Sequence, residues 1–336
     1  MHSAHANIPV FIPHLGCPNM CTFCNQKTIS GTVDFDVSKV NDLIDLSSEH
    51  AGKKRDKEIA FFGGSFTGID RDLMIRLLDI AQKRINEGKF SGIRMSTRPD
   101  YISEEILDIL SHYTISAIEL GIQSFSDAVL KKCKRGHTSD ISVKAMKLIN
   151  EYGFKSVGQM MIGLPGATNE DEIDCAKKIC ELGASGSRIY PTLVLKNTEL
   201  HEQTVKGEYI PLSLEEAIQR SANVLSVFIE NNVECLRIGL CESENLHSDD
   251  TFYAGPNHPA LGELVYGEIY YRAIKNTLSQ SEFDNSHVRI IVPSGAVSKA
   301  VGHKRCNIDR LKEEYEIKKI EIEEDIKLTP YSIRIE

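Results

Sequence analysis

Three cysteines, Cys17, Cys21 and Cys24, fall within one short segment with the spacing C-x3-C-x2-C. Thiolates are soft ligands, and soft ligands select iron–sulfur clusters, zinc or cuprous copper. Three thiolates on so short a segment can bind three corners of one compact centre. A cuboidal 4Fe–4S cluster has four irons and usually takes four cysteines. Because this segment supplies three, we expect a 4Fe–4S cluster with one iron open to a small molecule.

Zinc is the first alternative for this segment. Structural zinc sites pair closely spaced cysteines and take a fourth ligand nearby. His14 is a candidate fourth ligand, whereas the next cysteine along the chain is Cys133. Buried thiols that bind no metal are the second alternative. Soft sulfur alone does not choose among these three interpretations, so spacing leaves them open.

Strand-like runs alternate with helix-like runs through the first two thirds of the chain. The strand-like runs are Ile8–Pro13, Glu58–Phe62, Gly92–Ser96, Ala117–Ile122, Ser156–Ile162 and Ser187–Val194. This alternation predicts βαβ units and a parallel sheet. We therefore expect an α/β fold, a partial (β/α)6 TIM-like barrel that is curved and partly open.

Polar and glycine-rich segments follow these runs. They are Cys17 to Cys24, Gly63 to Thr67, Thr97 to Asp100, Gln123-Ser124, Gly163 to Gly166 and Tyr190 to Thr192. In barrels of parallel strands the active site lies at the carboxyl ends of the strands, so one shared ligand site is predicted there. Gly63 and Gly64 allow the backbone to approach a ligand closely; an ordinary tight turn is the alternative.

These segments resemble the radical SAM superfamily, in which Phe23 before the last cysteine is typical. The segments and their order along the chain resemble one branch of this superfamily, which contains the catalytic subunit of Elongator. The segments are Gly63 to Thr67, Thr97 to Tyr101, Glu119 to Ser124, Arg135 to Thr138, Gly163 to Gly166 and Arg188 to Val194. A more distant resemblance is to oxygen-independent coproporphyrinogen oxidase. The resemblance implies an enzyme with a 4Fe–4S cluster, which cleaves S-adenosyl-L-methionine (SAM) reductively to a 5′-deoxyadenosyl radical.

The resemblance also implies roles for individual residues. Cys17, Cys21 and Cys24 would hold the cluster, and the residues that would contact SAM are Phe23, Gly63, Gly64, Ser65, Gln123 and Arg135. The phenyl ring would pack on the cofactor and the glycine segment would meet its amino group, while the last two residues would meet its ribose and carboxylate. Two positions depart from related sequences, Ser96 for a glutamate and Gln159 for an aspartate. They put the ribose contacts in question.

The favoured substrate is RNA, with a tRNA uridine modification, and the electron donor would be a flavodoxin or a ferredoxin. The Elongator subunit carries an acetyltransferase domain after its barrel, and the tail up to Glu336 is too short for one, so the same overall reaction is not expected. Two alternatives stay open. One is oxidation of a small molecule, as in coproporphyrinogen oxidase, and the other is a non-catalytic protein that binds metal or RNA.

We expect two domains, the barrel at 1–240 and a small α+β extension at 241–336. Residues 287–336 resemble the core of a KH module, in which two helices flank a G-x-x-G loop that contacts the nucleic-acid backbone. Here the loop reads Gly302, His303, Lys304, Arg305, with arginine in place of the second glycine. Basic side chains contact phosphates, so this loop is predicted to bind RNA. A basic loop on a small cap is the alternative.

Composition limits the classes of protein that remain. A net charge of −9 argues against a protein that coats nucleic acid without specificity. Nine cysteines without a disulfide-like framework indicate a reducing cytoplasm. The amino terminus lacks the features of a signal peptide, and no apolar run is long enough to cross a membrane.

Overall fold

The computed structural model describes residues 5–12, 17, 21–25, 35–52, 56–240 and 250–336. The chain divides into two compact units. The first contains Met1–Leu212 and Val227–Pro256, and the second contains Ser213–Ser226 and Asn257–Glu336. The boundary expected at residue 240 assigns 213–226 to the barrel and 250–256 to the extension. The structure instead places 213–226 in the second unit and 250–256 in the first. Within the described ranges, no helix combines the length and the apolar character that a membrane span needs.

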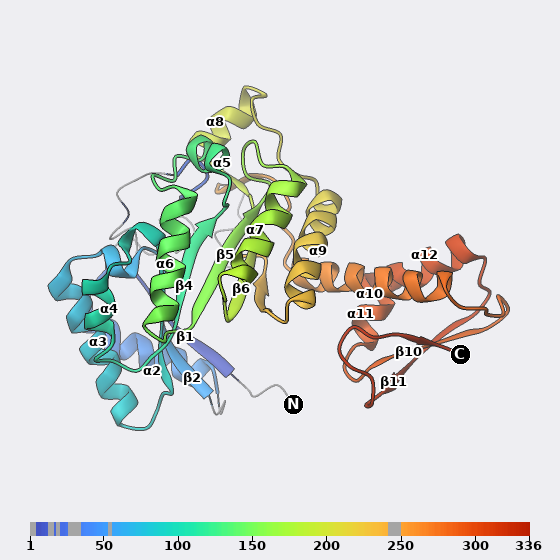
Figure 1. The fold of residues 1–336 in the computed structure, drawn as a ribbon, viewed down its shortest axis with the longest axis horizontal. Helices are drawn as coiled ribbons and strands as arrows, with labels where there is room; N and C mark the ends of the chain where they lie inside the picture. Colours follow the sequence, from blue (N-terminus) through green and yellow to red (C-terminus); the bar gives the residue numbers. More distant parts are fainter. Residues whose placement is uncertain (1–4, 13–16, 18–20, 26–34, 53–55, 241–249) are drawn as a thin grey trace. The chain divides into compact units, whose positions relative to one another are not determined.

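The first unit is built on one parallel sheet of seven strands in the order β1-β2-β3-β4-β5-β6-β8 (Figure 1). The strands are β1 (His5–Phe11), β2 (Asp56–Phe62), β3 (Gly92–Thr97), β4 (Ile115–Gln123), β5 (Ser156–Ile162), β6 (Gly186–Pro191) and β8 (Glu234–Ile238). Every neighbouring pair is parallel. The curled sheet confirms the expected partial barrel, and β8 adds a strand after the six predicted strand–helix units.

Helices follow the strands in the order that the alternation predicted. They are α2 (Val40–His50), α3 (Arg71–Asn86), α4 (Glu104–Leu110), α5 (Asp127–Lys132), α6 (Ser139–Glu151), α7 (Asn169–Glu181) and α8 (Glu199–Val205). Most of the next helix, α9 (Leu214–Glu230), belongs to the second unit. Helix α3 shows why they cover the sheet: Met74, Leu77, Leu78 and Ala81 are buried at helical spacing, forming one apolar stripe. Figure 1 shows α6 and α7 lying along β4 and β5.

Side-chain caps fix where several of these helices begin. Asp70 accepts a hydrogen bond from the backbone N–H of Leu73 at the start of α3. At the start of α7, Thr168 and Asp171 form a reciprocal capping box. Such caps each stabilise a helix by about 0.5–2 kcal/mol. They set the lengths of the strand–helix loops, and these loops carry the predicted site.

The second unit has its own apolar core and its own sheet, which confirms the expected small α+β domain. Its elements are α10 (Leu261–Ser279), β10 (Val288–Pro293), α11 (Val297–Val301), α12 (Cys306–Tyr315), β11 (Ile320–Asp325) and β12 (Arg334–Ile335). The strand order is β11-β10-β12, parallel for the first pair and antiparallel for the second. Ile274, Ile290, Ile308 and Leu311 are in the core between the helices and the sheet.

Candidate metal centre and cofactor site

The described part of the cysteine loop is tied to two neighbouring segments by backbone hydrogen bonds. The N–H of Thr22 donates to the carbonyl of Cys133, just after α5, at 3.1 Å. The N–H of Leu200 in α8 donates to the carbonyl of Thr22 at 2.9 Å, and Cys24 N–H donates to Cys21 C=O at 3.0 Å. These bonds hold the last two cysteines of the motif in a tight turn between α5 and α8.

Phe23 packs against two apolar clusters of the first unit. The first cluster contains Val129, Cys133 and Leu164, and the second contains Val194, Leu200 and Tyr209. The ring therefore anchors the cysteine loop from within. Packing of Phe23 on SAM stays a prediction.

The three cysteines differ in exposure and in their neighbours. Cys21 is buried, whereas Cys17 and Cys24 are half-buried. The thiol of Cys17 lies 3.7 Å from the hydroxyl of Ser65, so the motif's first cysteine reaches the glycine segment after β2. Coordinated cysteines are thiolates, and a thiolate would accept the hydrogen bond of this hydroxyl instead of donating to it.

The described residues include no group of three His, Cys, Asp or Glu side chains that could hold a metal ion. A single tetrahedral zinc gathers its sulfur ligands to within about 4 Å of one another. A cluster instead distributes its thiolates over several irons. His14, the candidate fourth zinc ligand, lies outside the described residues.

The glycine segment lies close to the end of β1. Gly63 has a φ of +102°, and a Cβ there would lie 3.2 Å from the carbonyl oxygen of Ile12. Glycine is therefore required for this turn, both by its conformation and by its space. Ser65 is 1% exposed. The predicted SAM contacts Gly63, Gly64 and Ser65 thus follow β2 directly, beside Cys17.

Gln123 ends β4 in an unusual conformation. Its φ is +69°, a left-handed conformation that costs a non-glycine residue free energy. The pairing with β5 shifts register between Gly121 and Gln123. Its side-chain oxygen is buried and accepts no hydrogen bond from the described part of the protein. The backbone angle and the unsatisfied acceptor are the observations that bear on Gln123, and its contact with SAM stays a prediction.

Arg135 is 7% exposed and lies against the cysteine loop. Its Nη1 is 3.3 Å from the Cys21 sulfur, and its Nη2 donates to the carbonyl of Gly121 at 2.5 Å. Its Nε is buried and has no partner among the described residues. The structure therefore brings Arg135 to a predicted cluster ligand. Its predicted contact with the SAM carboxylate stays untested.

Arg98 is a site residue that the resemblance did not assign. It is 3% exposed, and its fork binds both carboxylate oxygens of Asp100 at 2.9 Å. Its Nη2 also donates to the backbone carbonyl of Arg135 at 2.5 Å, while its Nη1 is buried without a partner in the described ranges. Burial by itself would lower the pKa of Arg98, but Asp100, Cys21 and Cys17 raise it overall. The guanidinium is therefore permanently charged beside the cysteines.

His137 completes this set of buried polar groups. Burial, together with the nearby charge of Arg135, lowers the pKa of His137 to about 4. Its Nε2 is buried and unpartnered in the part of the chain described. The imidazole is therefore neutral at neutral pH, so it adds no charge to the site.

These atoms decide whether the predicted cofactors fit. Leaving a buried donor or acceptor unpaired costs about 1–3 kcal/mol. Among the residues described, each of four residues has one such atom: Arg98 and Gln123 at the carboxyl ends of β3 and β4, and Arg135 and His137 in the segment between α5 and α6. Cysteine thiols close to Arg135 and Arg98, together with polar atoms that have no partner in the described part of the chain, fit an iron–sulfur cluster with a polar nucleoside ligand.

A second buried polar network lies across the strands themselves, and it was not predicted. Glu119 on β4 is 0% exposed and accepts both hydrogen bonds of the Arg188 fork, at 2.7 and 2.8 Å. Arg94 bridges Glu119 and Glu58, and Gln159 also donates to Glu119, at 2.8 Å. Burial would raise the pKa of Glu119, but the guanidinium of Arg188 and then that of Arg94 lower it overall. One charged residue in each of four strand-like runs is the feature of the sequence that could have indicated this network; these residues are Glu58, Arg94, Glu119 and Arg188.

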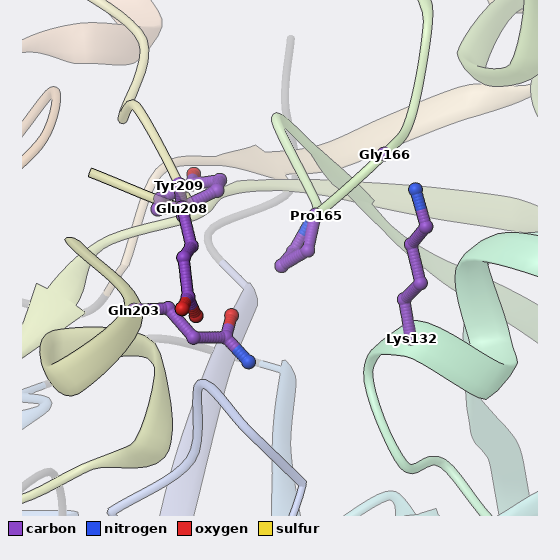
Figure 2. A pocket seen from close by; sticks show the side chains of 6 residues that line it. All are labelled: Lys132, Pro165, Gly166, Gln203, Glu208 and Tyr209. Carbon is purple, nitrogen blue, oxygen red and sulfur yellow. The ribbon is translucent and has the colours of Figure 1, made fainter. Parts of the chain in front are cut away.

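A small pocket of about 240 Å³ lies near the loop after β5. Figure 2 shows Lys132 on one side and Gln203 with Glu208 on the other, with Pro165 between them. The hydroxyl of Tyr209, which also lines the pocket, donates to the carbonyl of Gly163 at 2.7 Å. The pocket therefore adjoins the apolar cluster that holds Phe23.

In the second unit, Gly302, His303, Lys304 and Arg305 join α11 to α12, as the predicted loop requires. Gly302 has a φ of +78°, and a Cβ there would lie 2.8 Å from the side chain of Asn307. The amide of Asn307, which is 2% exposed, donates to the carbonyls of Gly267 and Ala300 at 2.8 and 3.2 Å. The loop is thus anchored from beneath, and its three basic-type side chains are exposed.

A curled parallel sheet with a three-cysteine loop after its first strand defines a class of iron–sulfur enzymes that use a nucleoside cofactor. Residues 11–179 match the sequence family described as the radical SAM superfamily, and residues 184–271 match its C-terminal domain. The chain belongs to the radical SAM superfamily.

Curated relatives are similar over part of the chain. An uncharacterized protein of Methanocaldococcus jannaschii is 32% identical over 60% of this chain and 65% of its own. A tRNA uridine(34) acetyltransferase of the same organism is 36% identical over 59% of this chain and 36% of its own. Among solved structures, Methanocaldococcus infernus Elp3, lacking residues 1–46, superposes with a TM-score of 0.64 at 25% identity. The match covers 81% of this chain and 64% of that one. The chain therefore spans between one third and two thirds of these relatives.

Proposed function

We propose that this protein is a radical SAM enzyme that acts on RNA, with a tRNA uridine as the favoured target. The observation that carries the enzymatic part is the cysteine loop, set beside buried polar atoms at the carboxyl ends of the strands. The RNA target is supported by the identity to a tRNA uridine(34) acetyltransferase. When bound, the cluster and SAM supply a 5′-deoxyadenosyl radical, with an electron from a flavodoxin or ferredoxin.

The protein's own residues hold and orient these groups. Cys17, Cys21 and Cys24 would hold the cluster. Backbone groups of the Gly63–Ser65 turn would receive the amino group of SAM. The side-chain oxygen of Gln123, which has no partner among the residues that the structure describes, would accept from a ribose hydroxyl. Phe23, which is partly buried, packs the loop against two apolar clusters.

Anaerobic reconstitution with iron and sulfide tests the enzymatic part. The intact protein is expected to bind about four irons and to form 5′-deoxyadenosine from SAM with dithionite. Cys21→Ala should lose both properties, whereas Cys306→Ala, an exposed cysteine of the second unit, should keep both. Zinc in place of iron in the intact protein, or full activity of Cys21→Ala, would refute the proposal.

The basic loop of the second unit is proposed to bind the RNA backbone. Lys304 and Arg305 are exposed next to each other, held by the anchored Gly302 turn. Replacing both by alanine should weaken tRNA binding and reduce its salt slope by about 0.7 for each phosphate that is no longer neutralised. Lys327→Ala, an exposed lysine of the same unit, is the matched control. Equal affinities and slopes for the double variant and the control would contradict RNA binding by this loop.

The substrate is tested in cells. Mass spectrometry of tRNA nucleosides from a deletion strain should show loss of one modified uridine. An unchanged nucleoside profile, together with accumulation of a haem precursor, would favour the small-molecule alternative over RNA.

A further inference from the structure

We propose that Arg98 and Arg135 form a buried cationic wall against the thiolate of Cys21, and that this wall raises the reduction potential of the cluster. The inference rests on the proposed function only in taking Cys17, Cys21 and Cys24 as cluster ligands. It assigns no contact with SAM or RNA. Both arginines are positioning residues, since they act through a ligand and not on the substrate.

Direct contact with the ligand comes from Arg135. Its Nη1 is 3.3 Å from the Cys21 sulfur, a distance suited to an N–H···S hydrogen bond. The bond to the Gly121 carbonyl fixes the other arm of the fork. Gly121 leaves room for this arm, because a Cβ there would lie 3.3 Å from Nη2. The guanidinium is thus held in one orientation by β4.

Arg98 supports this wall from the neighbouring strand end. Its Nη2 donates to the Arg135 carbonyl, which ties the segment after α5 to the end of β3. Its Nη1 is buried and has no partner in the described part of the chain, and the charges of Cys21 and Cys17 act on the guanidinium. The second cation is therefore close enough to the thiolates to interact with them.

Charge balance gives the direction of the effect. Two guanidinium groups stand against one carboxylate, that of Asp100, so the wall has a net positive charge. Reduction adds one electron to the cluster without making or breaking a bond, and a nearby positive charge stabilises the added electron. Hydrogen bonds to sulfur and low exposure are known levers on cluster potential. Burial limits screening by water and salt, so the effect persists at high ionic strength.

The test is a potentiometric titration of the reconstituted full chain, followed by electron paramagnetic resonance, without SAM or RNA. Arg135→Gln and Arg98→Gln should each lower the midpoint potential. The expected shift corresponds to a change of about tenfold in the ratio of reduced to oxidised cluster, or about 59 mV for one electron. Arg135→Lys keeps the positive charge but not the forked guanidinium, so it should lower the midpoint potential by less than Arg135→Gln does. Lys134→Gln is the control, because its cation is exposed and paired with Glu199.

Iron content is measured first for every variant, which separates the two proposals. If the intact protein binds no cluster, the proposed function fails. If the clusters form and Arg98→Gln and Arg135→Gln have the potential of Lys134→Gln, the wall alone is refuted. If Arg135→Gln loses its iron, the midpoint potential of Arg98→Gln tests the wall, because Arg135 still contacts Cys21 in that variant. A lowered potential in that variant supports the wall, and an unchanged one overturns it.

Discussion

Two pairs of buried arginines occupy the same half-barrel, and their partners differ. Arg94 and Arg188 lie within the sheet and bind two buried carboxylates, those of Glu119 and Glu58. Arg98 and Arg135 lie at the carboxyl ends of the strands; Arg98 binds the carboxylate of Asp100, whereas Arg135 binds the carbonyl of Gly121. The first pair is neutralised by its partners, whereas the second keeps a net charge and unpaired donors among the described residues.

The contrast separates structural burial of charge from functional burial. A buried network in which every group has a partner makes a fold rigid, and a network with missing partners costs free energy. The inner network spans β2, β3, β4 and β6 and fixes their register. The outer pair, Arg98 and Arg135, has missing partners that cost free energy. It lies beside Cys21, where a cluster and its ligand can supply the missing interactions.

Glu119→Gln tests most directly whether the inner network stabilises the fold. It removes the carboxylate that binds Arg188 and leaves Arg94 with Glu58, so the free energy of unfolding should fall by about 3–5 kcal/mol. Urea denaturation measures the loss, with Glu181→Gln, a surface residue on α7, as a control expected to change by less than about 1 kcal/mol. A loss for Glu119→Gln as small as that of the control would show that the inner network is not structural.

The pH dependence of stability should distinguish the two regions. The pKa of His137 is lowered to about 4, so the unfolded state binds the proton more readily between pH 6.5 and pH 4. Stability should fall as the pH drops through this window, by about 1–3 kcal/mol. His137→Gln should remove that slope. The pKa of Glu119 and that of Glu58 are also lowered, so the inner network should weaken only below about pH 4.3.

Chemical denaturation at a series of pH values measures both windows. If His137→Gln retains the full slope above pH 4.5, the histidine is not the group that titrates, and the separation of the two regions by pH is wrong.

Asp100→Asn should move the cluster potential in the opposite direction from Arg98→Gln. It removes the one carboxylate that offsets the outer arginines, so the potential should rise, by up to about 59 mV. The carboxylate is partly exposed, so solvent limits the effect on stability to about 1 kcal/mol. A fall in potential would mean that Asp100 acts by holding Arg98 in place and not by its charge.

The smallest effect is expected at Ser65. Its hydroxyl is 3.7 Å from the Cys17 sulfur and would donate to a coordinated thiolate. Ser65→Ala should lower the potential by about 20 mV, about a twofold change in the ratio of reduced to oxidised cluster. The same titration measures it, and Ser103→Ala, which affects only the cap of α4, should show no shift.

The sequence predicted the architecture well because it depends on local pattern. Apolar runs such as Ala117–Ile122 and the glycine turn at Gly63 each follow from a few adjacent residues. The inner network could not be predicted, because Arg188 on β6 and Glu119 on β4 are 69 residues apart and meet across the intervening strand β5. The direction of the Arg135 side chain was equally hidden, since its guanidinium binds the carbonyl of Gly121, 14 residues earlier.

The backbone bonds of Thr22 to Cys133 and Leu200 have a consequence for the life of the cofactor. The segment 21–25 is already held by these bonds, so it loses little conformational entropy when the cluster binds. We therefore expect that oxygen can destroy the cluster without unfolding the protein. The folded protein without its cluster would persist and could bind iron and sulfide again.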